Sequence, residues 1–389
     1  MDLEWSAQDA IFREEVRDWL AANVPAETRP PGNEGVDFDR AWQRTLNAGG
    51  WAGLNWPKEY GGRGLTLNQL MIWFEENAKV GAPPPGVFFV AQAHAGQTLI
   101  ALGTEKQKSK HLPGILRGDE VWCQGFSEPG SGSDLASLRT KAVIDGTDLI
   151  VSGQKIWTSF ADVADFQELL VRTEPESQRH TGLSWVICDM KSPGITVHPI
   201  KKLDGQAEFA SVFYDEVRIP LSNVVGEVNQ GWKTAMATLG FERGTAFIGE
   251  MVTLVLDLEK LIAYAKENPL TGQSRPAWSD DSVRRTLSRL RAELAALRAM
   301  NYSNLSRYIH GATPGAEGSV VKLFTNQVSQ RLESAAVDII GGRLLNANAP
   351  EQEWALSYYR SILHSIGGGT ADIQREIIAD RVLGLPRSR

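Results

Sequence analysis

The pattern of apolar and polar residues divides the chain into three parts. Residues 1–117 carry apolar side chains at helical spacing. Residues 118–229 consist of short β-rich runs that are separated by Gly, Asp and Pro turns. In residues 230–389 the helical period returns. The pattern therefore predicts an α+β protein with an N-terminal helical domain, a central β-barrel or sandwich domain and a C-terminal helical bundle.

Several elements are predicted by the residues at their ends. Ser6 is placed to cap a first helix, and a long helix is expected from about Gly231 to Ala265. The segment Asn268–Asp281 is rich in turn residues and is expected to be a loop. Thr370 is a good N-cap for a last helix over Ala371–Leu383. The expected strands are Lys141–Ile144, Leu149–Val151, Glu168–Val171, Ser184–Asp189, Ile195–Ile200 and Ser211–Ile219.

Two short segments, 122–134 and 155–159, carry most of the candidate chemistry. In the first, four small residues at 130–133 leave a backbone that can approach a flat or anionic ligand and donate its N–H groups. Ser127 adds a hydroxyl and Trp157 a broad ring face, which together suit a flavin ring. A Walker loop carries a Lys after its glycines, and no Lys follows them here. The Gly-x-Gly-x-x-Gly run of a dinucleotide-binding fold is also absent. For the Gly/Ser cluster alone, a surface turn is the alternative.

Composition excludes several classes of function. The chain has 389 residues, 42% of them apolar, and a formal net charge of −7, so no nucleic-acid partner is expected. Its two cysteines, Cys123 and Cys188, are too few for a disulfide framework and favour a reducing, cytoplasmic setting. The first residues do not resemble a signal peptide, and no apolar run is long enough to span a membrane. The six histidines show no metal-ligand spacing, so no metal site is expected.

The two segments resemble the flavin motifs of the acyl-CoA dehydrogenases, and the resemblance runs nearly end to end. That family's flavin loop, Thr-Glu-Pro-x-x-Gly-Ser-Asp, is matched by 127–134 with Ser in place of Thr. Its second motif, Gly-Gln-Lys-x-Trp-x-Thr/Ser, is matched by 153–159. The resemblance implies FAD as cofactor, an acyl-CoA substrate and an electron-transfer flavoprotein as partner. The residues that it assigns to the flavin are Gln124, Phe126, Ser127, Gly132, Ser133, Trp157, Thr158, Ser159, Arg275, Gly341, Gly342 and Thr370.

Dehydrogenation also needs a base to take the proton next to the thioester carbonyl. Most members of the family place this Glu in an Ile-Tyr-Glu-Gly-Thr stretch, which is matched here by 366–370, so that Gly368 stands where the Glu is expected. A branch with isovaleryl-CoA and long-chain enzymes carries the Glu on the helix after the β-domain, directly before an Arg. Glu242 and Arg243 match that alternative. The resemblance therefore implies Glu242 as the catalytic base.

The helical face around Glu242 is predicted to leave room for a ligand. At 100° per residue it carries small, mostly uncharged side chains, and desolvation there would raise the pKa of the carboxyl toward about 6–7. Close helix packing, with Glu242 in an ion pair, is the alternative interpretation. The residues of this face are Ala235, Thr238, Thr245, Ala246 and Gly249.

The resemblance assigns further groups to the substrate. The peptide N–H groups around Gly368 and Gly369 would bind the thioester oxygen as an oxyanion hole, although a simple helix start also explains part of this stretch. Ser133 would bond the pantetheine arm, or be a turn serine. Leu239 and Arg243 would contact the substrate, and for Arg243 a structural ion pair is the alternative.

The match weakens at the half-site that each subunit offers to its neighbour's flavin. The family's Gln-x-x-Gly-Gly-x-Gly motif is matched only in part at 338–343, where both adjacent glycines are kept, Asp338 replaces the Gln and Arg343 follows the glycines. Of a second motif, Arg-x-x-Phe-Gly, Arg275 and Trp278 keep only the spacing. The chain is expected to form a homo-dimer or tetramer, or a hetero-oligomer in which a related chain completes the site. An oxygen-using flavin oxidase or monooxygenase, and a non-catalytic subunit, are the alternative functions.

Overall fold

The computed structural model describes residues 5–309, 315–346 and 348–386, without the side chains of 242–247 and 308–309. The chain folds into two units, each of which is formed by segments that are far apart in sequence. One runs from Ala22 to Thr66 and from Ala82 to Glu242 and holds the sheet. The other is helical and combines the described residues up to Ala21, the segment Leu67–Gly81 and those from Arg243 onward. Domain boundaries after residues 117 and 229 stay a prediction.

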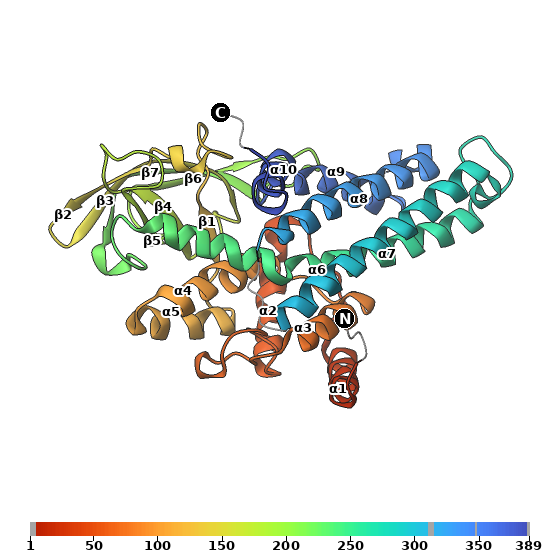
Figure 1. Cartoon of the computed structure of the whole chain (residues 1–389), viewed down its shortest axis with the longest axis horizontal. Coiled ribbons are helices and arrows are strands. Elements are labelled where there is room, and N and C mark those ends of the chain that lie inside the picture. The colour runs from red at the N-terminus through yellow and green to blue at the C-terminus, as the bar shows by residue number, and fades with distance from the viewer. Residues whose placement is uncertain (1–4, 310–314, 347, 387–389) are drawn as a thin grey trace. The chain divides into compact units, whose positions relative to one another are not determined.

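The sheet unit is built on seven strands that form one hydrogen-bonded sheet (Figure 1). The order is β1-β4-β2-β3-β7-β6, with β5 paired to β4. β1 runs parallel to β4, whereas β3 is antiparallel to both β2 and β7. The strands are β1 (Trp122–Gly125), β2 (Lys141–Asp145), β3 (Asp148–Ser159), β4 (Phe166–Arg172), β5 (Leu183–Asp189), β6 (Ile195–Ile200) and β7 (Phe209–Pro220).

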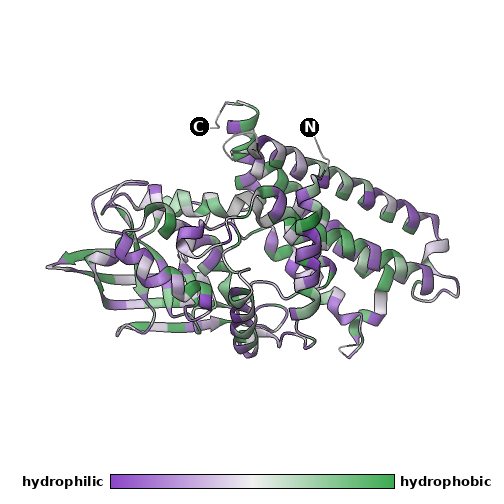
Figure 2. Ribbon diagram, turned by 90° about the horizontal axis from the view of Figure 1, so that it is seen from below, coloured by the Kyte–Doolittle hydropathy of each residue, from purple (hydrophilic) through white to green (hydrophobic). Residues whose placement is uncertain are grey.

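All six predicted strands are confirmed, most of them with longer ends. Buried and more exposed residues alternate along β3 and β7, whereas β4 and β5 are buried almost throughout. Figure 2 shows that hydrophobic and hydrophilic residues are mixed along the strands of the sheet. The pattern does not predict β1, because four residues beside a Gly-rich turn give no periodic signal. The fold class, helices at both ends of the chain around a central sheet, is also confirmed.

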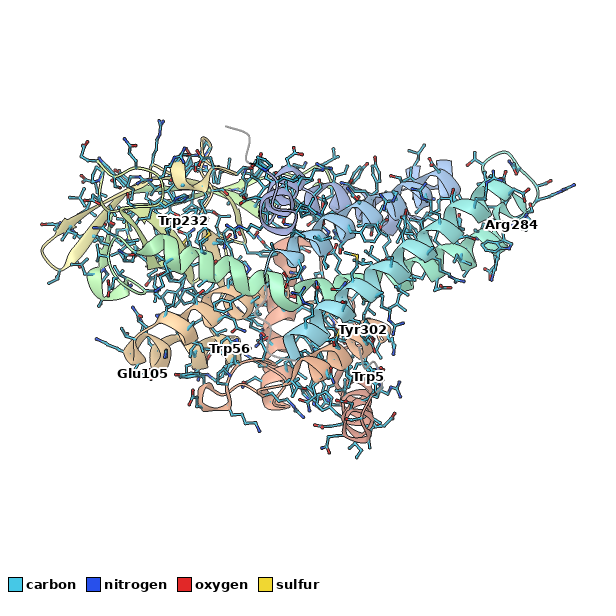
Figure 3. All side chains as sticks on the ribbon, in the orientation of Figure 1. Trp5, Trp56, Glu105, Trp232, Arg284 and Tyr302 are labelled. Carbon is cyan, nitrogen blue, oxygen red and sulfur yellow. The ribbon has the colours of Figure 1, made fainter. Side chains whose placement is uncertain are left out.

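Helices complete the sheet unit. Thr104 caps α5 with a capping box, and Trp56, labelled in Figure 3, is fully buried and donates its indole N–H to the carbonyl of Gln92 (3.2 Å). The helices of this unit are α2 (Val36–Ala48), α4 (Gly96–Leu102), α5 (Glu105–Arg117) and the first part of α6 (Gly231–Glu267).

The helical unit packs around a leucine-rich core. Leu258 on α6, Leu290 on α7 and Leu332 on α8 are all buried in it. No helix among the described residues is long and apolar enough to cross a membrane. The other helices of this unit are α1 (Ala7–Asn23), α3 (Leu67–Lys79), α7 (Asp281–Ile309), α8 (Glu317–Ile340), α9 (Gln352–His364) and α10 (Ala371–Ile377).

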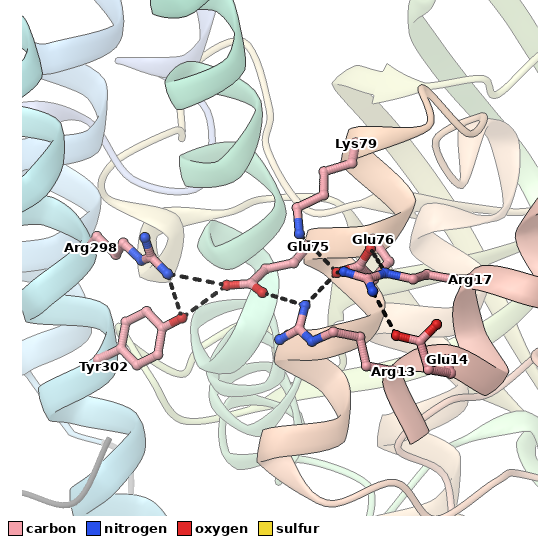
Figure 4. A network of polar contacts seen from close by, with 8 residues as sticks. All are labelled: Arg13, Glu14, Arg17, Glu75, Glu76, Lys79, Arg298 and Tyr302. Carbon is pink, nitrogen blue, oxygen red and sulfur yellow. Dashed lines mark hydrogen bonds and ion pairs between the residues drawn. The ribbon is translucent and has the colours of Figure 1, made fainter. Parts of the chain in front are cut away.

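Ion pairs join α1, α3 and α7 within this unit (Figure 4). Arg13 on α1 bonds both Glu75 (2.9 Å) and Glu76 on α3. Arg17 donates to the other oxygen of Glu76 (2.9 Å), and Tyr302 on α7 donates to Glu75 (2.9 Å). These contacts explain why α3, which precedes the sheet in sequence, belongs to the same unit as the C-terminal helices.

The predicted helix ends are largely confirmed. Ser6 caps α1 by accepting the N–H of Asp9 (3.1 Å), and Thr370 caps α10 by accepting that of Ile373 (3.3 Å). The long helix α6 ends two residues beyond its predicted end. The last helix is shorter than predicted, because α10 ends at Ile377 and a π-helical turn, Ile378–Val382, follows.

Candidate functional site

The two candidate flavin motifs lie side by side in the sheet unit. The N–H of Ile156, in the second motif, donates to the carbonyl of Ser127 in the first (2.9 Å). One residue earlier, the Nζ of Lys155 donates to the carbonyl of Phe126 (2.9 Å). Segments that are about thirty residues apart in sequence therefore form one surface of the sheet unit.

Lys155 and Glu128 form a buried ion pair beneath this surface. The Lys155 side chain is fully buried, and its Nζ lies 2.9 Å from a Glu128 carboxylate oxygen. Burial lowers the pKa of Lys155 to about 8, although Glu128 opposes the shift. Burial alone would raise the pKa of Glu128, but Lys155 and the N–H groups of Arg139 (2.7 Å) and Thr140 (2.8 Å) outweigh it and lower that pKa. Every group of this pair is satisfied, so it fixes the loop that begins at Ser127.

Trp157 is held out to solvent by a bulge in β3. The β3–β7 register shifts between Lys155 and Thr158, and Trp157 has a φ of 62°. A bulky residue rarely adopts this left-handed conformation, which is a sign of local strain. The residue remains 58% exposed, and its ring makes an edge contact with Phe209 at 6.2 Å between centroids. A large apolar ring presented in this way suits stacking against a flat ligand.

The remaining residues of the two motifs differ in what they offer a ligand. Ser127 and Ser159 are half-buried, and Gly132 and Ser133 are exposed. A Cβ built on Gly132 would meet nothing within 4 Å, so the loop there is open. Hydroxyls and open backbone beside the Trp157 ring fit the polar edge and the face of a flavin.

Phe126 and Thr158 turn their side chains inward. Both are buried, and the Oγ1 of Thr158 has no hydrogen-bond partner in the described part of the chain. These two residues can therefore reach a flavin only through their backbone, and their assignment to the cofactor stays a prediction.

Gln124 belongs to a polar cluster that the sequence does not reveal. The parallel register of β1 and β4 places Gln124 opposite Glu168, and its Nε2 donates to a carboxylate oxygen of Glu168 at 2.7 Å. The Nδ1 of His94 lies 3.3 Å from each of them. Glu168 and His94 are buried, whereas Gln124 is half-buried. His94 lies on a π-helical turn, Ala91–Ala95, a feature that is frequent at functional sites.

The face of α6 that carries position 242 is packed rather than open along part of its length. Ala235 and Thr238 are fully buried, and the Oγ1 of Thr238 lies 2.8 Å from that of Thr98 on α4. A Cβ on Gly249 would sit 3.6 Å from Phe74. The prediction of ligand room is therefore wrong at Ala235 and Thr238, where close helix packing uses the small side chains, whereas the contact at Gly249 is an ordinary one and the residue is half-buried.

The other predicted residues of α6 differ in how far they are described. Leu239 packs partly buried against the sheet-unit core. Glu242, Arg243, Thr245 and Ala246 lie on the helix, but their side chains fall outside the described part of the structure. The base and substrate assignments therefore stay predictions.

The glycine stretch before α10 is held by its carbonyl groups. The Nζ of Lys322 donates to the carbonyl of Gly367 (2.5 Å), and the Nε2 of Gln374 to those of Gly368 (3.3 Å) and Gly369 (3.1 Å). Gly368 and Gly369 have φ values of 63° and 96°, which favour glycine. Their N–H groups have no acceptor among the described residues, so they are suited to bind an oxyanion.

The residues predicted to complete a neighbour's flavin site are engaged within the helical unit. The N–H of Gly342 donates to the hydroxyl of Thr271 (3.3 Å), and a Cβ on Gly341 would sit 2.4 Å from the same hydroxyl. Arg343 donates to Tyr264 (3.1 Å) and to the carbonyl of Pro269 (3.1 Å). Thr271 and Pro269 lie in the predicted loop between α6 and α7.

The other two residues of this region are exposed. Arg275 lies in the same loop, and Asp338 lies on α8. Within the described chain no group of three or more His, Cys, Asp or Glu residues could hold a metal ion.

The sequence matches the models of three protein-family domains along its length. These are the N-terminal domain of acyl-CoA dehydrogenases over residues 6–119, the middle domain over 123–217 and the C-terminal domain over 229–383. The chain is 40% identical to acyl-CoA dehydrogenase IpdE1 of Mycobacterium tuberculosis, with 97% of each chain covered. It is 33% identical to acyl-CoA dehydrogenase FadE26 of the same organism, with 100% of both chains covered.

Two solved structures share the fold over the full length of both chains. The Tcur3481-Tcur3483 steroid ACAD has a TM-score of 0.87 and 34% identity. The ChsE4-ChsE5 complex from Mycobacterium tuberculosis has a TM-score of 0.87 and 32% identity. Both names describe proteins assembled from two different chains.

Proposed function

This chain belongs to the acyl-CoA dehydrogenase family of flavoprotein oxidoreductases, and we propose that it is an FAD-dependent enzyme that converts an acyl-CoA thioester to a trans-2-enoyl-CoA. The observation that carries the proposal is the joining of both flavin motifs, with Lys155 locking the loop and Trp157 presenting its ring. An exposed aromatic ring beside hydroxyl groups and open backbone suits the binding of a flat ligand such as a flavin.

The residues would divide the reaction as follows. Glu242 takes the proton from the carbon next to the thioester carbonyl, and the N–H groups of Gly368 and Gly369 stabilise the negative charge that develops on the carbonyl oxygen. When bound, FAD supplies the acceptor for the β-hydrogen, which leaves as hydride. Ser127 and Ser159 hold the polar edge of the ring, and Ser133 bonds the pantetheine arm.

A steroid-derived acyl group is the proposed substrate class. The support is the name of the steroid ACAD, whose whole length matches this chain at 34% identity. Electron-transfer flavoprotein as the acceptor rests on the family resemblance alone. The cytoplasmic setting stays a prediction from Cys123 and Cys188, which are both free and buried.

Anaerobic bleaching of the bound flavin tests this function. Octanoyl-CoA, isovaleryl-CoA and a 3-oxo-steroid propanoyl-CoA would be added to the holoenzyme, and we expect the steroid thioester to bleach the flavin fastest. Glu242→Gln should slow bleaching by about 10³-fold, within the range that a positioned base contributes. Glu259→Gln, an exposed change on the same helix, is the control.

Three outcomes would contradict parts of the proposal. Absence of bleaching with all three thioesters would reject the dehydrogenase activity. Turnover within about tenfold of the parent in Glu242→Gln would reject the base, since a base contributes more than this. Oxygen consumption with substrate and no other acceptor would identify an oxidase or monooxygenase instead.

A further inference from the structure

The cluster of His94, Gln124 and Glu168 is not explained by flavin binding alone. A fully buried carboxylate is costly unless donors surround it, and Glu168 has both Gln124 (2.7 Å) and His94 (3.3 Å) beside it. Both donors contact the same Glu168 oxygen. Nδ1 therefore lies at the Glu168 edge of the His94 ring, and Nε2 lies at the opposite edge. The imidazole is thus held in one orientation by the sheet.

Helix α4 runs antiparallel to the first part of α6. Just beyond the C-terminal end of α4, Gln107 donates to the carbonyls of Ser222 and Val224 (2.9 Å each). Thr234, near the start of α6, donates to the adjacent carbonyl of Val225 (3.4 Å). The end of α4 and the start of α6 therefore share one anchor, so α4 runs toward it and α6 runs away from it (Figure 1).

The contact between Thr98 and Thr238 sets the register of this helix pair. One turn before Thr98 lies His94, and one turn after Thr238 lies position 242. The steps from Thr98 to His94 and from Thr238 to position 242 each cover four residues, about 6 Å along the helix. Because the helices are antiparallel, both steps lead away from the anchor, so the backbones of His94 and residue 242 lie opposite each other. Both positions belong to the sheet unit.

We propose that His94 is a positioning residue for the base Glu242, held in place by Glu168 and Gln124. This inference rests on the proposed function and adds to it the way in which the base is oriented. Glu168 and Gln124 fix the ring through Nδ1, so that Nε2 lies on the edge that faces away from Glu168. A base that is held in one orientation loses less freedom on reaching the transition state.

A rate cycle between His94 and Glu242 tests the inference. The rate of flavin bleaching would be measured for the parent, His94→Gln, Glu242→Asp and the double variant, with whichever of the three thioesters bleaches the parent fastest. We expect His94→Gln to slow the parent by about tenfold or more, with KM within about threefold. The same change should slow Glu242→Asp by less than about twofold, because coupled residues are not additive.

Three further variants complete the test. Glu168→Gln should reproduce the effect of His94→Gln, because it acts through the same ring, and His94→Asn serves if His94→Gln does not retain flavin. His111→Gln is the matched control, since His111 is also buried and pairs with a glutamate, Glu120, at 2.9 Å. This control should bleach at the parental rate.

The outcomes separate this inference from the proposed function. Equal slowing of the parent and of Glu242→Asp by His94→Gln would show a structural role and overturn the inference. A parental rate in His94→Gln would also overturn it. In either case the parent would still bleach and the function would stand. A parent that does not bleach would reject the function, and a Glu242→Gln variant near the parental rate would reject the base on which the inference rests.

Discussion

Lys155 makes the two flavin motifs depend on each other. Its ammonium group is fully buried, and it contacts the carbonyl of Phe126 and the carboxylate of Glu128, which stand on either side of Ser127. With a pKa of about 8 the side chain remains largely charged at pH 7. Removing one partner of a buried ion pair leaves the other charge uncompensated, which costs more than the pair itself contributes.

We therefore expect Lys155→Met to weaken both folding and flavin retention. The change should lower the free energy of unfolding by about 3 kcal/mol, because Glu128 loses its buried counter-charge. FAD affinity should fall at least about tenfold as the loop at Ser127 is released. Urea unfolding and the flavin retained after gel filtration measure the two effects.

The matched control is Lys191→Met. Lys191 pairs with Asp165 at 2.9 Å but its side chain is 77% exposed, so its loss should have little effect. Equal behaviour of the two variants would contradict the role assigned to Lys155.

At single residues, the sequence predicts what a local pattern encodes. The open Gly/Ser loop and the exposed Trp157 follow from the motifs themselves. The pair of Lys155 with Glu128 and the pair of Gln124 with Glu168 do not, because isolated polar residues carry no periodic signal. Gln124 and Glu168 are brought together by the register of β1 and β4.

Among the elements, α1, α3 and α7 are joined by one polar network (Figure 4). Glu76 is its most enclosed member, with a side chain only 4% exposed. Burial alone would raise the pKa of Glu76, but hydrogen bonds from Arg17, Lys79 and Arg13 outweigh it and lower the pKa to about 2. The charged form of Glu76 thus holds three cations from two helices.

Glu76→Gln should destabilise the protein in a pH-dependent way. A carboxyl whose pKa is depressed on folding stabilises the protein above its unfolded pKa, about 4.3, and loses this effect as the pH falls toward 2. We expect a loss of roughly 2 kcal/mol at pH 7, which shrinks between pH 4 and pH 2 because the parent then protonates. Thermal unfolding across this pH range measures it.

Glu14→Gln is the control for this network. Among the described residues Glu14 forms an ion pair only with Arg17, at 2.7 Å, and its side chain is 65% exposed, so the effect of its loss should be small at every pH. A pH-independent effect of Glu76→Gln would mean that packing, not charge, accounts for the loss.

The elements themselves can largely be predicted, but their packed faces cannot. Strands and helix caps carry local signals, and these signals predict six strands and both caps. The small residues around position 242 permit two interpretations, ligand room or close packing, and the sequence does not decide between them. The partners of Ala235 and Thr238 come from α4 and the sheet-unit core, which lie far away in sequence.

For the whole molecule, the adenylate half-site raises the question of a second chain. The N–H of Gly342 donates to the hydroxyl of Thr271, and Arg343 donates to the hydroxyl of Tyr264. Asp338 adds an exposed negative charge. A diphosphate would find few donors among these residues and an unfavourable charge nearby. The sequence shows the changed motif, but no property of a single chain reveals the partner that compensates for it.

We therefore expect the chain expressed alone to hold well under one FAD per chain. The reason is that two copies would offer each other the same weak half-site, whereas a related chain can supply a better one. Flavin absorbance against protein concentration after gel filtration measures the ratio. One full FAD per chain would remove the need for a related partner.

The π-helical turn at Ala91–Ala95 makes the His94 cluster sensitive to chain length. A π turn accommodates one residue more than an α turn, so deleting a single residue there would regularise the helix. Each residue of an α-helix turns the chain by about 100°, and such a deletion would swing the imidazole away from Glu168. Relatives that gained or lost this polar cluster are therefore expected to differ by an insertion or deletion in this segment rather than by an exchange of side chains alone.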